Sequence, residues 1–296
     1  MRALWMTSLR PIGKSLENDK IQEIFLNSLD TFGSKITLSL TQFDDVGVKD
    51  YIDNKKINKF FINFPRNSLP FGTKYSNKIM LNNALDQFIE NSFDYLVYST
   101  ADIFLPNNLF DEIDIIEQRL GKDKEFCSLV FPNILKKNGN IKSYTTPHYG
   151  IDLFIFKLKK KSALKLKEAI KCWDQYDWGI NDNFYVSVCE LLELPIFNMY
   201  KNIEIIKFEN DFKTIDENRG WQIDSWKKNQ KYFINFLKKN NISILYAYGS
   251  YYYLLIKIFK LRNFSFKLLI VYLKFYIYTP IHLINKIINF FTFKKY

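Results

Sequence analysis

Strand and helix signals alternate along the first hundred residues, and this alternation limits the possible folds more than any other feature of the chain. The strand signals cover residues 2–9, 35–43, 56–64 and 93–105. Two segments between them, residues 17–32 and 75–92, have apolar residues at helical spacing. Because such an order builds a mainly parallel sheet covered by helices, the sequence predicts an α/β domain.

The same alternation continues to about residue 225 and then stops. Helical patterns follow at residues 107–121, 160–176 and 181–194, and strand patterns at 126–135, 149–158 and 202–211, with a polar turn at 136–143. From residue 226 onward, lysines interrupt runs of Phe, Tyr, Ile and Leu. We therefore expect two regions, an α/β catalytic domain at 1–225 and a helical basic and aromatic extension at 226–296.

Positive charge is concentrated in that extension. The chain has 42 Lys and Arg against 31 Asp and Glu, and thirteen of the basic residues lie beyond Asp224, where no acid occurs. Positions 1 to 224 therefore hold 29 basic and 31 acidic residues, a net charge of −2. The excess positive charge belongs to the last quarter of the chain.

Cysteines and apolar runs indicate a cytoplasmic protein. Cys127, Cys172 and Cys189 lie far apart without a CxxC pair, which argues against a disulfide framework or a zinc site. The apolar patch at the N-terminus is too short for a signal peptide. No segment reaches the roughly 18 to 20 uncharged apolar residues of a membrane span.

Polar side chains follow four of the predicted strands. They are Thr7, Ser8 and Arg10; Asp44 and Asp45; Thr100 and Asp102; and the segment from His148 to Asp152. Ligands of open α/β sheets bind outside the carboxyl ends of the strands, so these groups are candidate site residues. Read alone, Asp102 is also consistent with an acid that caps the next helix or binds a loop amide.

Residues 97–110, VYSTADIFLPNNLF, resemble the apolar strand and DxD motif of nucleotide-sugar glycosyltransferases of the GT-A fold. In that motif Asp102 matches the last acid, and Thr100 stands in place of the first. Four further segments resemble the same enzymes in the same order, so that the resemblance extends over roughly residues 3 to 215. They are residues 8–29, 40–48, 148–156 and 176–188.

The resemblance implies a nucleotide-sugar donor and a divalent cation, Mg²⁺ or Mn²⁺, held by Asp102 with help from the Thr100 hydroxyl. Such a cation offsets the charge that develops on the departing diphosphate. Arg10 or Lys74 is the alternative source of that positive charge. The related enzymes often have a histidine after the last strand, where this chain offers Glu209 or Asp211.

The resemblance also suggests a general base and further substrate contacts. Asp182 is the first candidate to accept the acceptor's proton and Asp152 the second; a helix N-cap and a loop-orienting role are the respective alternatives. His148 and Trp178 are candidate substrate contacts. A hydrogen-bonded turn residue and an aromatic side chain of the core are the alternatives for these two.

The extension has features of a membrane-surface segment. Lys260, Lys267 and Lys274 are seven residues apart and share a helical face, with apolar and aromatic residues around the rest. Packing against the catalytic domain or a second subunit is the alternative. Nucleic acid is disfavoured, because long aliphatic residues dilute the lysines.

These observations lead to one interpretation and one rival. The first is a glycosyltransferase, peripheral on the inner face of the plasma membrane, that adds a sugar to a cell-surface glycan or lipid-linked acceptor. The Asn, Lys, Ile and Phe bias suggests a bacterial source, and polysaccharide or lipopolysaccharide biosynthesis is the expected setting. The rival is a catalytically inactive GT-A-like subunit that binds donor and is recruited to the membrane.

Overall fold

The computed structural model describes residues 1–65, 76–138, 142–147, 151–172, 181–199, 203–208 and 230–247. Its centre is a seven-stranded sheet in the order β10-β6-β9-β4-β1-β2-β3. The strands are β1 (Ala3–Thr7), β2 (Ile36–Gln42), β3 (Lys59–Asn63), β4 (Tyr95–Ser99), β6 (Phe126–Val130), β9 (Leu153–Lys157) and β10 (Ile196–Asn198). Every pairing is parallel except those of β9, which is antiparallel to β4 and β6. The predicted mainly parallel sheet is confirmed.

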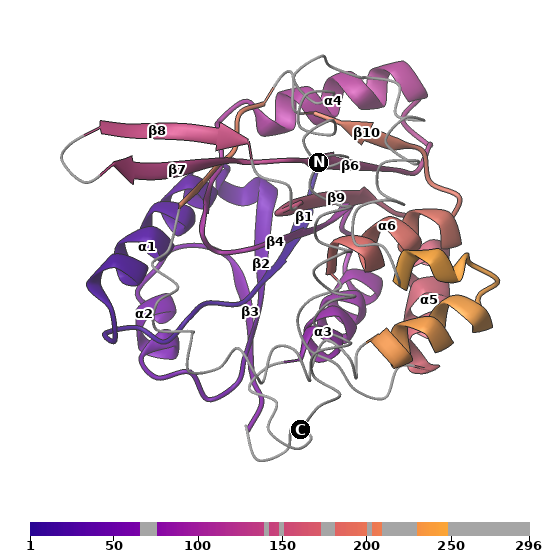
Figure 1. The fold of residues 1–296 in the computed structure, drawn as a ribbon, viewed down its shortest axis with the longest axis horizontal. Coiled ribbons are helices and arrows are strands. Elements are labelled where there is room, and N and C mark those ends of the chain that lie inside the picture. Colours follow the sequence, from indigo (N-terminus) through magenta and orange to yellow (C-terminus); the bar gives the residue numbers. More distant parts are fainter. Residues whose placement is uncertain are drawn as a thin grey trace, which may run out of the picture.

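Helices cover both faces of this sheet (Figure 1). One face is covered by α1 (Leu16–Asp30), α2 (Val48–Asp53) and α4 (Leu109–Leu120), and the other by α3 (Asn77–Glu90), α5 (Lys160–Ala169) and α6 (Asn181–Leu191). Short 3-10 turns lie at η1 (Gly33–Lys35), η3 (Ile170–Cys172) and η5 (Ile244–Ala247).

The two helical layers follow from strand geometry, because successive side chains of a strand point to opposite faces of the sheet. Trp5 thus packs with α1, whereas its neighbours Leu4 and Met6 pack with α3.

The two long N-terminal helices begin at serine caps. Ser15 accepts a hydrogen bond from the amide of Asn18, and Ser76 accepts one from the amide of Ile79. Each cap satisfies an amide that has no partner within the helix. The caps fix where the chain turns from loop into helix, and α1 thereby starts six residues after Arg10, which lies in the loop that follows β1.

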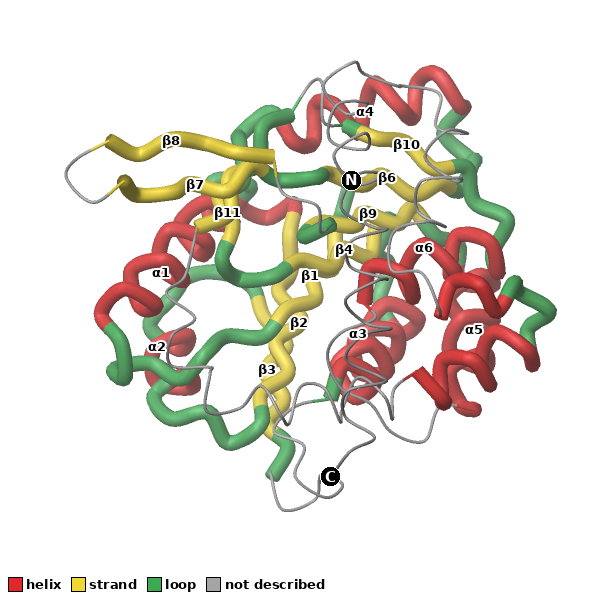
Figure 2. The backbone as a smooth tube through the Cα atoms, viewed as in Figure 1, coloured by secondary structure: helices red, strands yellow, loops and turns green. Residues whose placement is uncertain are grey.

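A second, smaller sheet has the order β5-β11-β7-β8 (Figure 2). Its strands are β5 (Ile103–Phe104), β11 (Ile206–Phe208), β7 (Asn133–Asn138) and β8 (Lys142–Pro147). Two predicted strands were therefore wrong as single units. Residues 93–105 divide into β4 and β5, and residues 126–135 into β6 and β7, in different sheets. Both halves of each segment are apolar, so the pattern does not show where the chain changes sheet.

Residues 136–143, predicted to be a turn, also contribute strand residues. β7 and β8 pair antiparallel from Asn133 with Pro147 to Asn138 with Lys142. Their lysines and asparagines have low strand propensity, and cross-strand pairing outweighs it. In Figure 1 this hairpin projects from the body of the protein beside α1.

Part of the basic extension is built into the core. Residues 230–239 form a helix whose Phe233 and Phe236 are fully buried, and both rings pack against Phe184 of α6. The Tyr246 hydroxyl donates a hydrogen bond of 2.7 Å to Glu190, also in α6. Within the part of the chain that the structure describes, no helix combines the length and apolarity needed to cross a membrane. Lys260, Lys267 and Lys274 lie outside the described residues.

Candidate functional site

The candidate site lies at the edge of the central sheet where β1, β2 and β4 end. These strands are parallel, so their carboxyl ends lie side by side. Asp102 follows β4 by three residues and joins it to β5 of the smaller sheet. Its carbonyl oxygen accepts a hydrogen bond of 2.9 Å from the amide of Phe208, and its side chain is only 10% exposed. Asp102 does not cap α4, because Asn108 occupies the N-cap position.

Asp152 reaches the same place because β9 runs antiparallel to β4. Leu153, the first residue of β9, pairs with Ser99, the last residue of β4. The Thr100 amide donates to the Asp152 carbonyl at 3.2 Å, and the Thr100 hydroxyl lies 3.3 Å from Asp152 Oδ1. The sequence predicted that polar groups after separate strands converge, and the structure brings Thr100, Asp102 and Asp152 together.

Lys207 of β11 places its ammonium group at both carboxylates. Its Nζ lies 2.5 Å from Asp152 Oδ1 and 3.8 Å from Asp102 Oδ1. The position follows from the smaller sheet, in which Lys207 pairs with Ile103, the residue after Asp102. The Lys207 side chain is 15% exposed, so this charge is held in a largely buried setting.

The surrounding charges decide the protonation of Lys207. Burial alone would lower the pKa of its ammonium group, because the charged form loses hydration. The negative charges of Asp152 and Asp102 outweigh the effect of burial, and Asp182 also raises the pKa. The pKa of Lys207 is therefore above its ordinary value. Lys207 is therefore a permanent positive charge near neutral pH.

Arg10 provides a second cation from the loop after β1. Its Nη2 lies 3.7 Å from Asp102 Oδ2. Helix α1 holds this loop, since Gln22 Oε1 accepts from the Arg10 amide at 2.5 Å and Asn18 Oδ1 accepts from Arg10 Nη1 at 3.1 Å. With 35% of its side chain exposed, against 10% for Asp102, Arg10 is the more accessible to a ligand.

Asp182 lies in the first turn of α6 and supports the loop that carries Asp152. Its Oδ2 accepts a hydrogen bond of 3.0 Å from the amide of Ile151. The side chain is partly exposed. Asp182 thus joins the same group of charges from α6, which covers the face of the sheet opposite to α1.

Thr7 and Ser8 lie at the end of β1. The Thr7 side chain is buried, and its hydroxyl donates to the Ser99 carbonyl at 2.9 Å, which ties β1 to β4. Ser8 is partly buried beside it. Thr7 therefore acts on the site through the position of β4, and Ser8 is the nearer of the two to solvent.

Asp44 and Asp45 form the acidic loop after β2, on the same edge of the sheet. Asp44 is exposed, adopts a left-handed backbone with φ of 54°, and its Oδ1 accepts from Asn63 Nδ2 at 2.8 Å. Asp45 Oδ2 accepts from the Phe43 amide at 3.1 Å. These hydrogen bonds shape a loop at the end of the sheet in which Asp44 is exposed and Asp45 partly exposed.

Several predicted site residues lie outside the described part of the chain. They are Lys74, His148, Trp178, Glu209 and Asp211. Lys207, in contrast, was missed by the sequence analysis. The available signal was a single lysine in the apolar run IEIIKF, two residues before the position at which Glu209 was considered.

The described residues at Asp102 do not fit a divalent cation. Mg²⁺ prefers an octahedral shell of oxygen ligands at about 2.0–2.1 Å. Both oxygens of Asp102 already face cations, Arg10 at Oδ2 and Lys207 at Oδ1. Two like unit charges 4 Å apart repel by about 4 kcal/mol at an effective dielectric constant near 20, and a dication doubles this. Among the residues described, no three His, Cys, Asp or Glu side chains are grouped to hold a metal ion.

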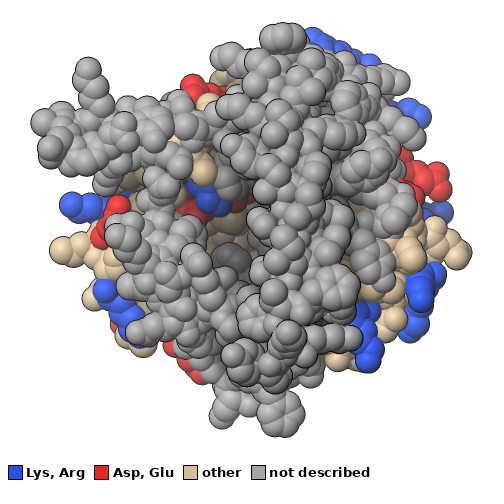
Figure 3. All heavy atoms as spheres, viewed as in Figure 1, with Lys and Arg blue, Asp and Glu red and all other residues tan. Residues whose placement is uncertain are grey.

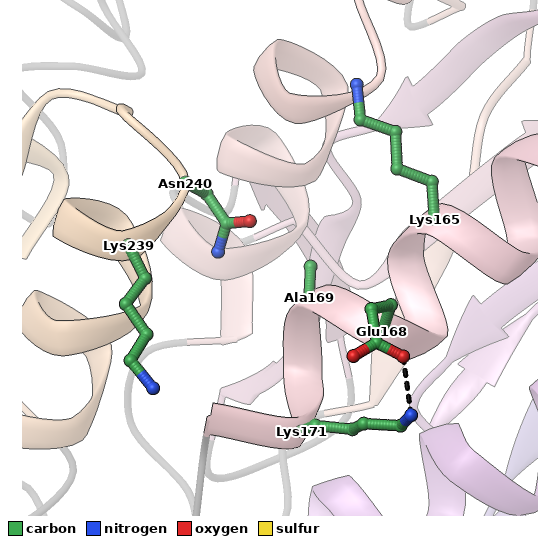
Figure 4. Close-up of a pocket in the computed structure, with 6 residues that line it drawn as sticks. All are labelled: Lys165, Glu168, Ala169, Lys171, Lys239 and Asn240. Carbon is green, nitrogen blue, oxygen red and sulfur yellow. Dashed lines mark ion pairs between the residues drawn. The ribbon is translucent and has the colours of Figure 1, made fainter.

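Figure 3 shows basic and acidic side chains close together around a hollow on the face that it presents. A different hollow, drawn in Figure 4, lies between α5 and the helix at 230–239. It is lined by Lys165, Glu168, Ala169, Lys171, Lys239 and Asn240. Lys171 is paired with Glu168 at 2.5 Å, and both side chains are more than 60% exposed. This second hollow has the character of a solvated surface.

The fold is GT-A-like, and comparison with solved structures agrees. No family model and no curated protein matches the sequence. The structure of residues 1–349 of TarS from S. aureus, in complex with UDP-GlcNAc, superposes with a TM-score of 0.52 at 10% identity. The match covers 83% of this chain and 69% of that one.

Two further similar structures superpose with lower TM-scores. The mannosyltransferase PcManGT from Pyrobaculum calidifontis, in complex with GDP-Man and Mn²⁺, has a TM-score of 0.45 at 11% identity, covering 83% of this chain and 68% of that one. A nucleotide-diphospho-sugar transferase from Desulfovibrio desulfuricans G20 has a TM-score of 0.41 at 11% identity, covering 80% and 99%. At these identities the TarS superposition establishes the fold.

Proposed function

We propose that the protein is a glycosyltransferase that moves a sugar from a nucleotide-sugar donor to an acceptor hydroxyl. The observation that supports this most is the cluster of Arg10, Asp102, Asp152 and Lys207 at the carboxyl edge of a GT-A-like sheet. Ligands of α/β sheets bind at this edge. The cluster brings two fixed cations to the place where a donor diphosphate would lie.

The proposed reaction assigns roles to these groups. A bond forms between the acceptor oxygen and the anomeric carbon, and the bond from that carbon to the diphosphate oxygen breaks. Arg10 stabilises the charge that develops on the departing diphosphate, which is electrostatic stabilisation of a leaving group. Asp182 accepts the acceptor's proton, with Asp152 as the second candidate. Asp152 is already engaged by Thr100 and Lys207, which favours Asp182.

Metal assistance through Asp102 is the alternative form of the same proposal. It requires Lys207 to move away from the carboxylates, so that Asp102 Oδ1 becomes available to the cation. In either form, the loops after β1 and β2 would contact the nucleotide through Ser8, Asp44 and Asp45. Lys74, His148 and Trp178 are proposed as further substrate contacts.

We infer a hexosyl or related transfer to a cell-surface glycan or lipid-linked acceptor in a bacterium, with the protein held on the inner face of the plasma membrane by its basic extension. Thirteen basic residues without a single acid beyond Asp224 support this. Each basic residue near an anionic surface contributes about 1 kcal/mol.

A panel of UDP-, GDP- and CMP-sugars, with release of the nucleotide measured by chromatography, tests the function. Slow hydrolysis of one donor, accelerated by a membrane extract that contains acceptor, is the expected result. Binding of a donor without turnover under all conditions would support the inactive binding subunit instead. Absence of both binding and turnover across the panel would overturn the proposal.

A further inference from the structure

The ammonium group of Lys207 lies between two carboxylates of the candidate site, and the proposed reaction gives it no role of its own. Its Nζ lies 2.5 Å from Asp152 Oδ1 and 3.8 Å from Asp102 Oδ1, and the side chain is 15% exposed. Arg10 faces the other oxygen of Asp102 at 3.7 Å. Asp102 therefore has a cation at each of its oxygens, and both cations belong to the protein.

We propose that Lys207 is the resident cation of the donor site and takes the place of a divalent metal ion. The inference rests on the proposed function. Lys207, held by Asp152 and Asp102, and Arg10, held by α1, together bind the diphosphate of the donor. Binding of a nucleoside diphosphate is then independent of Mg²⁺ and Mn²⁺.

The charges of the cluster support this arrangement. Each oxygen of Asp102 faces a protein cation, Arg10 at Oδ2 and Lys207 at Oδ1, so a dication at Asp102 would have to displace one of them. A diphosphate instead meets the Arg10 guanidinium, whose planar donors suit phosphate oxygens. Asp102 and Asp152 hold the cations in position, and these carboxylates are positioning residues in the proposed complex.

A purely structural ion pair is the competing explanation, and the chain contains one for comparison. Lys157, at the far end of β9, pairs with Glu117 and is 15% exposed, like Lys207. Lys157 pairs with Tyr95, the first residue of β4. Lys207 contacts Asp102 and Asp152, which lie at the other end of β4, next to its last residue Ser99. The two lysines thus have the same exposed fraction and each is paired with at least one carboxylate, but they lie near opposite ends of β4.

The first experiment uses the unmodified full-length protein. UDP, GDP and CDP are titrated by calorimetry in EDTA and again with Mn²⁺, and Mn²⁺ alone is titrated by electron paramagnetic resonance. We expect one nucleotide to bind equally in both buffers and no bound Mn²⁺ in its absence. Binding that requires Mn²⁺ would overturn the role of Lys207 and leave the glycosyltransferase proposal intact. Binding of none of the nucleotides in either buffer would overturn both.

Variants then locate the effect. Lys207→Met should weaken nucleotide binding in EDTA by roughly 10- to 100-fold, the loss of one charge-assisted contact, and Mn²⁺ should restore part of it. Lys207→Arg, which keeps the charge, should retain binding in EDTA and serves if Lys207→Met does not fold. Lys157→Met is the matched control and should leave nucleotide affinity unchanged. Equal losses of affinity in Lys157→Met and Lys207→Met would overturn the proposal.

Discussion

Lys207 Nζ lies 2.5 Å from Asp152 Oδ1, although the two residues are 55 positions apart and belong to segments of different sheets. Asp152 immediately precedes β9 of the central sheet, and Lys207 lies in β11 of the smaller one. The pair therefore fastens the two sheets together at the edge where the donor is proposed to bind. The same side chains thus contribute to stability and to the proposed donor binding. A variant at Lys207 or Asp152 must therefore be tested for folding as well as for activity.

Asp102→Asn should reduce sugar transfer by roughly 100-fold or more, the size of effect seen when one preorganised electrostatic contact is lost. The amide keeps the shape of the side chain but no longer attracts Arg10 and Lys207. Circular dichroism should show an unchanged fold, and nucleotide release should measure the loss. Asp111→Asn, on α4, is the control and should be fully active. Full activity in Asp102→Asn would exclude Asp102 from the site.

Arg10→Gln should raise the KM for the donor by roughly tenfold, as expected for the loss of one charged hydrogen bond. The amide of residue 10 can still donate to Gln22, so the loop stays anchored. Steady-state kinetics with varied donor measures this change. A milder effect is expected for Asn18→Ala, which frees the guanidinium without removing it. An unchanged KM in Arg10→Gln would show that the guanidinium does not contact the donor.

Two substitutions of Asp182 separate a general base from a loop support. Asp182→Asn retains an oxygen that accepts from the Ile151 amide but removes the base. If Asp182 takes the proton, kcat falls by roughly 10²- to 10⁴-fold with donor KM unchanged. Wild-type kcat in Asp182→Asn together with low activity in Asp182→Ala would assign the residue to the loop alone.

The sequence predicted the central fold because its strands are short apolar runs separated by segments with apolar residues at helical spacing. It also predicted that Thr100, Asp102 and Asp152 meet, although by assuming that polar strand ends converge. The actual cause for Asp152 is the antiparallel direction of β9, which places the start of that strand beside the end of β4. Strand direction depends on distant pairing and leaves no local signal.

Lys207 was not predicted for a related reason. A lysine within an apolar strand is typical of an edge strand, where it protects against aggregation. β11 is instead an interior strand of the smaller sheet, flanked by β5 and β7. That sheet is assembled from segments near residues 103, 135, 145 and 207, and no local pattern connects them. The contact of Lys207 with the acids is therefore a consequence of tertiary structure alone.

The ion pair at the opposite end of β9 predicts a pH-dependent stability. Burial alone would raise the pKa of Glu117, but hydrogen bonds from Lys157 and Tyr95 outweigh it and the pKa is lowered. A carboxyl group with a lowered folded-state pKa stabilises the protein above its unfolded-state pKa, and the contribution is lost as the pH falls through the folded-state value.

Glu117→Gln should therefore lower Tm at pH 7 by about 3–6 °C. The basis is about 1.5–3 kcal/mol for a hydrogen bond to a charged group and about 2 °C per kcal/mol for a chain of this size. The difference from wild type should shrink as the pH falls below the usual range of a glutamate. Thermal denaturation at pH 7 and in steps toward pH 3 measures it. A difference that grows on acidification would contradict the assignment.

Removal of residues 248–296 should release the protein from anionic vesicles without unfolding it. The cut must follow Ala247, because Phe233, Phe236 and Tyr246 are fully buried and a shorter chain would lose part of the core. The deletion removes eight of the thirteen basic residues beyond Asp224. At about 1 kcal/mol per basic residue near an anionic surface, the deletion removes about 8 kcal/mol of attraction. Flotation with phosphatidylserine vesicles, and with neutral phosphatidylcholine vesicles as the control, measures attachment. Undiminished binding of the shortened protein to anionic vesicles would place the membrane contact in residues 1–247.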